Sequence, residues 1–166
     1  MKKIIVIGLL LTLIPGVADL SIGKEQIGLG IGTFYNIALQ EKKESRNYFS
    51  LAAGFRSKFN WLILNTDIDY QSESKDITYI LTSKISLLAE ILESGFYLGP
   101  GIEKSYVKWV SGITEASEFT YFIQAGWEIP SENVSLALDL CYEPSPPFQQ
   151  IDTDFISLGI RLLFYF

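Results

Sequence analysis

Hydrophobic side chains alternate with small or polar ones over eight successive segments of this 166-residue sequence. A period of two residues is that of a β-strand, in which neighbouring side chains point to opposite faces. The pattern therefore predicts an all-β protein of eight antiparallel strands in up-and-down order, joined by short connections. The expected strands cover residues 27–40, 47–58, 61–71, 77–88, 95–108, 118–129, 134–143 and 153–166.

The two faces of these strands differ in composition. One face carries almost only Leu, Ile, Val and aromatic side chains, while the other carries many glycines and alanines together with the charges. Small residues suit a narrow interior, and each strand is about long enough to cross a bilayer at a tilt. We therefore expect a transmembrane β-barrel with its apolar face in lipid. A secreted, lipocalin-like barrel that binds an apolar ligand inside would need the opposite facing and is the alternative.

The aromatic residues fall near the two ends of the expected strands, as interfacial girdles do. One rim would carry Tyr35, Tyr70, Tyr79 and Tyr142, and the other Phe59, Trp61, Phe96, Trp127 and Phe166.

The start of the chain has the features of an export signal. Two lysines precede an apolar run over residues 4–14, and small residues follow it at 15–18. Eleven residues at 1.5 Å each span only about 16 Å, roughly half of a hydrocarbon core, so a membrane anchor fits less well. We predict a cleaved signal peptide over residues 1–18 and one barrel domain over residues 19–166.

The last expected strand alternates up to a terminal phenylalanine, through Leu158, Ile160, Leu162, Phe164 and Phe166. With the signal peptide and the segment 96–102, this strand resembles the small eight-stranded outer-membrane β-barrels of the OmpA transmembrane-domain and OmpX type. The resemblance implies a monomer integral to the bacterial outer membrane and surrounded by lipid. It also implies that these five residues are the signal read by the outer-membrane barrel assembly machinery.

Composition excludes several functions. The sequence has no histidine, so catalysis by an imidazole base and His-ligated metal sites are excluded, and lipid A-modifying barrels of this size rely on histidine. A net charge of −6 disfavours nucleic acid, and the single cysteine cannot form an internal disulfide. We expect a non-enzymatic protein with no catalytic residue, no cofactor and no metal, acting in envelope structure or surface interaction.

The alternation turns ten charged side chains into the lumen: Arg56, Lys58, Asp67, Asp69, Lys84, Glu103, Glu128, Asp139, Glu143 and Arg161. Buried charges should pair, and by strand height we expect one cluster of Asp67, Lys84 and Glu103 and another of Asp139, Arg161 and Glu128. Such a network either fills the barrel as a static plug or acts as a gate in a narrow channel for small solutes or ions.

Four connections are expected at the outer end, over residues 41–46, 72–76, 110–117 and 144–152. Nearby strand ends rich in aromatic residues, at Tyr106, Trp109, Tyr121 and Tyr142, suggest a surface for an unknown ligand above the membrane. Pro100, inside an expected strand, predicts either a bulge or a locally weak pairing.

Overall fold

The structure, a computed structural model, describes residues 25–39, 47–72, 77–91, 94–131, 134–144 and 154–166. Within these ranges the chain forms nine strands and no α-helix: β1 (Gln26–Ala38), β2 (Tyr48–Phe59), β3 (Leu62–Ser72), β4 (Ile77–Glu90), β5 (Phe96–Trp109), β6 (Thr114–Ala116), β7 (Thr120–Ile129), β8 (Val134–Glu143) and β9 (Phe155–Tyr165). The signal peptide predicted over residues 1–18 lies outside the described residues. In the described part of the chain, no helix is long and apolar enough to cross a membrane.

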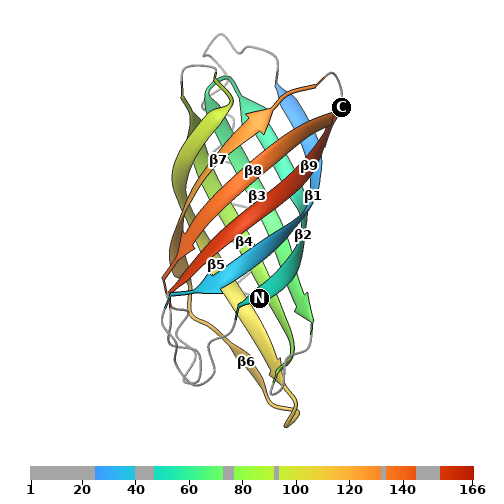
Figure 1. Ribbon diagram of the computed structural model, residues 1–166, viewed down its shortest axis with the longest axis vertical. Coiled ribbons are helices and arrows are strands. Elements are labelled where there is room, and N and C mark those ends of the chain that lie inside the picture. The colour runs from blue at the N-terminus through green and yellow to red at the C-terminus, as the bar shows by residue number, and fades with distance from the viewer. Residues whose placement is uncertain (1–24, 40–46, 73–76, 92–93, 132–133, 145–153) are drawn as a thin grey trace, which may run out of the picture.

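The eight long strands of the described chain close into a barrel. They are hydrogen-bonded in the order β4-β3-β2-β1-β9-β8-β7-β5, and an additional pairing between β4 and β5 joins the two edges. Every pairing is antiparallel, as predicted. Figure 1 shows the tilted strands, with the C-terminus at the top and β6 projecting past the lower end. These are called the C-terminal end and the β6 end.

The apolar face is turned outward. Leu136, Leu138 and Leu140 of β8 are exposed, whereas Ser135, Ala137 and Asp139 between them are buried. The same alternation runs through the other long strands, so large hydrophobic side chains cover the outer wall. A secreted barrel that binds an apolar ligand inside would need its apolar face turned toward the interior, so that alternative is wrong.

Inside the barrel, glycines face large rings on the neighbouring strand. A Cβ atom added to Gly159 would lie 2.2 Å from Cε1 of Phe34, so only glycine leaves room for that ring. Four cross-strand partners share this arrangement: Gly28 with Tyr165, Gly101 with Phe122, Gly126 with Tyr97, and Gly159 with Phe34. The inward glycines therefore give aromatic side chains the space to fill a narrow interior.

The segment expected as a loop at 110–117 contains structure that the alternation did not reveal. Residues of β6 pair with the end of β5, from Tyr106 opposite Ala116 to Lys108 opposite Thr114. This hairpin extends past the barrel (Figure 1). Trp109 was expected above the membrane, but its side chain is buried, because it falls on the inward phase of the lengthened β5. The other expected outer connections lie mostly outside the described residues.

Pro100 weakens a pairing without causing a bulge. The β4–β5 register passes from Ser86 opposite Gly101 to Ala89 opposite Leu98, so the two positions between them are unpaired while the register is unchanged. A register shift in this pair of strands occurs elsewhere, between Ile77 and Tyr79.

Aromatic residues mark the two boundaries of the apolar wall. Rings meet at the β6 end in the pairs Tyr35–Phe49 and Tyr70–Tyr79, and at the C-terminal end Phe96 stacks on Trp127. On β5, Phe96 and Tyr106 are ten residues apart. At 3.3 Å per residue and a tilt of 40° this separation corresponds to roughly 25 Å, the height of the apolar band in outer-membrane barrels.

Leu138→Arg places a charge on the outer wall near the middle of β8. In lipid the substitution should lower the free energy of unfolding by about 2–4 kcal/mol, because the guanidinium group has to enter the hydrocarbon region. Urea titration of the barrel folded in liposomes measures this loss. The matched control, Tyr121→Arg in the exposed β6-end girdle, should cost about 0–1 kcal/mol. Equal costs at the two positions would contradict the lipid-facing wall.

Candidate functional site

The charged side chains inside the barrel form two clusters at different heights. The arginine cluster consists of Arg56, Asp67, Glu128, Asp139 and Arg161, and the lysine cluster consists of Asp69, Lys84, Glu103 and Glu143. All nine side chains are buried. Lys58, the tenth inward charge, lies near the C-terminal end, with its Nζ atom 2.5 Å from Glu90 Oε2.

In the arginine cluster, two guanidinium groups share one carboxylate. Asp139 Oδ2 lies 3.3 Å from Arg161 Nε, and its Oδ1 lies 3.9 Å from Arg56 Nη2. Each arginine has a further acidic partner: Arg161 Nη1 is 2.7 Å from Asp67 Oδ1, and Arg56 Nη1 is 3.1 Å from Glu128 Oε2. The five charges come from five different strands, so the cluster joins the wall across the lumen.

Neutral side chains add hydrogen bonds to the arginine cluster, although Asp139 Oδ2 and Arg161 Nε have no hydrogen-bond partner among the described residues. Tyr97 Oη and Gln124 Nε2 donate to Asp139 Oδ1 at 2.6 and 2.7 Å. Asn65 Oδ1 accepts from both Arg56 Nε and Arg161 Nη1. Alternation along residues 95–108 puts Tyr97 on the inner face, but it gives the face of a side chain and not its partner across the lumen, so these contacts could not be predicted.

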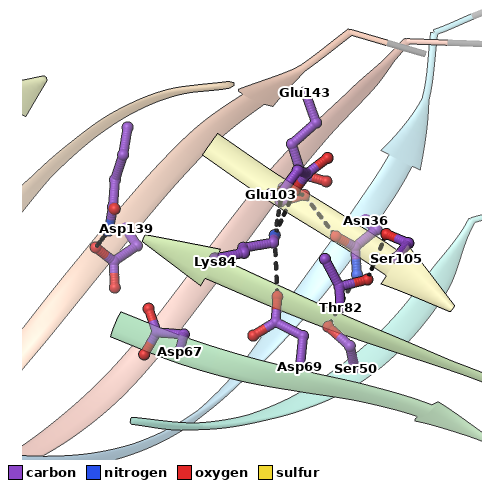
Figure 2. A network of polar contacts seen from close by, with 12 residues as sticks. Asn36, Ser50, Asp67, Asp69, Thr82, Lys84, Glu103, Ser105, Asp139 and Glu143 are labelled. Carbon is purple, nitrogen blue, oxygen red and sulfur yellow. Dashed lines mark hydrogen bonds and ion pairs between the residues drawn. The ribbon is translucent and has the colours of Figure 1, made fainter. Parts of the chain in front are cut away.

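The lysine cluster has one cation among three carboxylates. Figure 2 shows the ammonium group of Lys84 between Asp69 on one side and Glu103 and Glu143 on the other. Its Nζ atom lies 2.5 Å from Glu143 Oε1, 2.9 Å from Asp69 Oδ2 and 3.7 Å from Glu103 Oε2. Because three carboxylates share one ammonium group, this cluster is more acidic than the arginine cluster.

Hydroxyl groups take up part of the remaining hydrogen-bonding capacity of the lysine cluster. Thr120 Oγ1 donates to Glu103 Oε1 at 3.2 Å, and Ser157 Oγ lies 3.1 Å from Glu143 Oε1. Beside them, the hydroxyl oxygens of Thr82 and Ser105 are 2.8 Å apart. The carboxylates are therefore held in fixed positions by their neighbours.

The structure brings the predicted charges together, with two changes of partner. Asp67 was expected to pair with Lys84 because of its height on the neighbouring strand, and the two residues do stand opposite each other in the β3–β4 register. That pairing is wrong: Asp67 lies next to Arg161 on β9, and Asp69 is the β3 partner of Lys84. Glu128 was grouped with Arg161, but its arginine partner is Arg56. Long side chains reach across the lumen, so adjacency in the sheet does not fix the partner.

Apolar side chains lie on both sides of the charged layers. Toward the β6 end, Val107, Trp109 and Phe155 form a buried cluster, and Ile77 and Ile80 pack against it. Toward the C-terminal end, buried residues Ile63, Leu88 and Tyr97 form a second cluster. These inward apolar residues depart from the polar face predicted for the lumen. Glu128 lies nearer the C-terminal end than the second cluster, and with Lys58 and Glu90 it lines a pocket at that mouth of the barrel.

A small cavity of about 50 Å³ remains beside the lysine cluster, lined in part by Gln71, Thr82 and Tyr48. Asp69 Oδ1, Gln71 Oε1 and Glu103 Oε2 are buried there without a hydrogen-bond partner among the described residues. The volume suits one or a few water molecules, which such polar atoms hold in protein interiors. Among the described residues, no group of three or more acidic or cysteine side chains is placed to hold a metal ion.

The five residues of the predicted assembly signal lie along one line on the outside. Leu158, Ile160, Leu162 and Phe164 occupy the exposed face of β9, and Phe166 follows the strand with 81% of its surface exposed. They contribute to the apolar wall and have no part in the charged interior.

Comparison with solved structures identifies the architecture. Neisserial surface protein A (NspA) is matched with a TM-score of 0.62 at 14% identity, over 89% of this chain and 100% of that one. The N-terminal β-barrel domain of Pseudomonas aeruginosa OprF gives a TM-score of 0.54 at 12% identity, over 85% and 100%. Ail, the attachment invasion locus protein of Yersinia pestis, gives 0.50 at 16%, over 87% and 100%.

The chain has the fold of the small outer-membrane β-barrels. Neither the protein-family models nor the curated proteins contain a match to the sequence. At 12–16% identity the likeness concerns the fold of the outer-membrane barrel and not an activity.

Removing the shared carboxylate tests whether the interior of the barrel is dry and its charges mutually paired. Asp139→Ala leaves two buried guanidinium groups with fewer partners, and it should lower the free energy of unfolding by about 3–5 kcal/mol. Urea titration in liposomes, followed on unheated gels, measures the change. The control Glu118→Ala removes an exposed carboxylate and should cost less than about 0.5 kcal/mol. Similar costs for both variants would indicate an interior open to water.

Proposed function

We propose that the protein is an integral outer-membrane barrel, exported by its signal peptide and inserted by the barrel assembly machinery, with a structural or surface-interaction role and no enzymatic activity. The observation that carries this proposal is that the charged side chains inside the barrel are paired with one another. The buried charges of the described strands are paired with one another, and apolar clusters share the interior with them, which suits a filled barrel rather than a reaction site.

The outer wall supports the membrane location. Its apolar band is bounded by aromatic residues at both ends, as in proteins that live in a bilayer. The strand β9 carries the alternating face, from Leu158 to Phe166, that we propose the assembly machinery reads. A single closed sheet needs no partner subunit to satisfy its strand edges, which favours a monomer.

The β6 end supports a surface-interaction role. The hairpin of β5 and β6 extends past the barrel, and it exposes Val110, Ile113 and the nearby Phe119. Among the proteins that share the fold, Ail has been solved with the heparin analogue sucrose octasulfate. For this chain, an apolar and aromatic projection favours a protein or lipid contact over a sulfated sugar.

Membrane fractionation tests the location. The full chain expressed in a Gram-negative host should remain in urea-washed outer membranes, because the apolar wall holds it in lipid. On gels it should migrate differently before and after boiling, because the closed barrel resists unfolding by detergent until heated. A soluble periplasmic band, or a mobility that boiling does not change, would refute the proposal.

A narrow cation channel is the second candidate. Three carboxylates around Lys84, two of them with an oxygen that lacks a hydrogen-bond partner among the described residues, line the small cavity and would attract cations. Against this, a buried apolar cluster lies between the lysine cluster and the β6 end, and a second one lies toward the C-terminal end. The plug therefore remains the favoured interpretation.

Planar bilayer recordings separate the plug from the channel. The filled interior predicts no unitary conductance for the wild type and none for Arg161→Ala, whose loss leaves the apolar clusters in place. Cation-selective single-channel conductance in the wild type, changed in Lys84→Ala or Arg161→Ala, would support the channel. Ser83→Ala, on the outer wall beside Lys84, is the control that should leave either result unchanged.

A further inference from the structure

The outer wall carries very few charges, and they lie together. On the outward face of the described strands, Lys104 and Lys108 are the only charged side chains, and both belong to β5. Lys104 stands opposite Ser83 of β4, and Lys108 stands opposite Tyr79 on one side and Thr114 on the other. In a sequence with 19 acidic and 13 basic residues, this pair makes one sector of the wall cationic.

Aromatic rings surround the two ammonium groups. Nζ of Lys104 lies 5.1 Å from the ring centroid of Phe119 and 5.8 Å from that of Tyr106. Nζ of Lys108 lies 5.9 Å from the centroid of Tyr79. These rings belong to the β6-end girdle, so the lysines lie at the depth of the lipid headgroups. Within the described residues, neither lysine forms an ion pair.

The surface between the lysines and the C-terminal end is apolar and suits acyl chains. Ile102 and Leu98 continue the outward face of β5 toward the C-terminal end, and Ile85 lies beside Ile102 on β4. The two lysines are four residues apart on one strand, which corresponds to about 13 Å. A molecule that fits this surface has an anionic headgroup that reaches one or both lysines. Its hydrocarbon chains pack against Leu98, Ile102 and Ile85, which together are called the apolar strip.

We propose that Lys104 and Lys108, with the rings of Tyr79, Tyr106 and Phe119, form a binding site for the phosphate-bearing headgroup of an anionic membrane lipid. The inference rests on the proposed membrane location. Charge complementarity supports this occupant, because the wall presents two cations that have no acidic partner among the described residues at the depth where a headgroup phosphate lies. The opposite girdle, at the C-terminal end, has no outward lysine or arginine among the described strand residues, so the site belongs to one leaflet.

Native mass spectrometry of the detergent-folded full chain tests the site. Dioleoyl phosphatidylglycerol and dioleoyl phosphatidylcholine, which differ in headgroup charge but not in acyl chains, are titrated separately, and the bound fraction gives the preference for the anionic lipid. A cationic residue near the membrane surface contributes roughly a fivefold preference. Lys104→Gln and Lys108→Gln should each lower the preference by about this factor, and the double variant should abolish most of it.

Two controls isolate the site from net charge. Lys58→Gln removes the same charge from the inner face at the other end and should leave the preference unchanged. The double substitution Lys104→Arg with Lys108→Arg keeps both charges and should retain it. Equal binding of the two lipids by the wild type, or an equal loss in Lys58→Gln, would overturn the proposal. Glycerol 1-phosphate that displaces the lipid at equal concentration would also overturn it, since the apolar strip would then contribute nothing.

Failure of the lipid site is distinguishable from failure of the proposed function. Each variant is first run unheated and boiled on a gel. A folded band with an unchanged lipid preference overturns the lipid site alone, whereas a wild-type chain that never shows a heat-dependent band overturns the membrane barrel itself. The two single variants provide the measurement if the double variant does not fold.

Discussion

The β4–β5 pairing closes the sheet, so none of the eight long strands of the described chain has a free edge. A bilayer offers no water to unpaired backbone groups, so a sheet can cross it only without free edges. Once the sheet is closed, every strand has one face toward lipid and one toward a confined interior. The alternation of residues then becomes a division between an apolar wall and a charged lumen.

The narrow interior determines how the inward side chains are arranged. Eight strands leave space only for side chains, and inward glycines opposite large rings make that space available. The charges that remain are stable only as mutual partners, because each would be costly alone. Asp139, held by two arginines, Tyr97 and Gln124, connects four strands in addition to its own. Contacts across the lumen thus stabilise the barrel from inside, while the membrane stabilises it from outside.

Because side chains fill the interior of the barrel, contacts with other molecules are expected on its outer surfaces. The interior is occupied, while the β5–β6 hairpin and the wall around Lys104 differ from the rest of the exterior in shape and charge. The same architecture at 12–16% identity in NspA, OprF and Ail shows how little sequence the barrel itself requires. The fold constrains the alternation and the packing of the interior more than the identity of individual surface residues, so surface residues are free to diverge.

The sequence alone was enough to predict the eight long strands, their antiparallel order and the inward facing of ten charged side chains. These follow from a two-residue period, which is a local property of the chain. The folded structure was needed to show that Asp67 lies next to Arg161 instead of Lys84, that Val107 and Trp109 pack against Phe155, and that β6 extends the hairpin. Contacts across the lumen depend on the stagger of all eight strands and on side-chain reach, and neither is encoded in the alternation of a single strand.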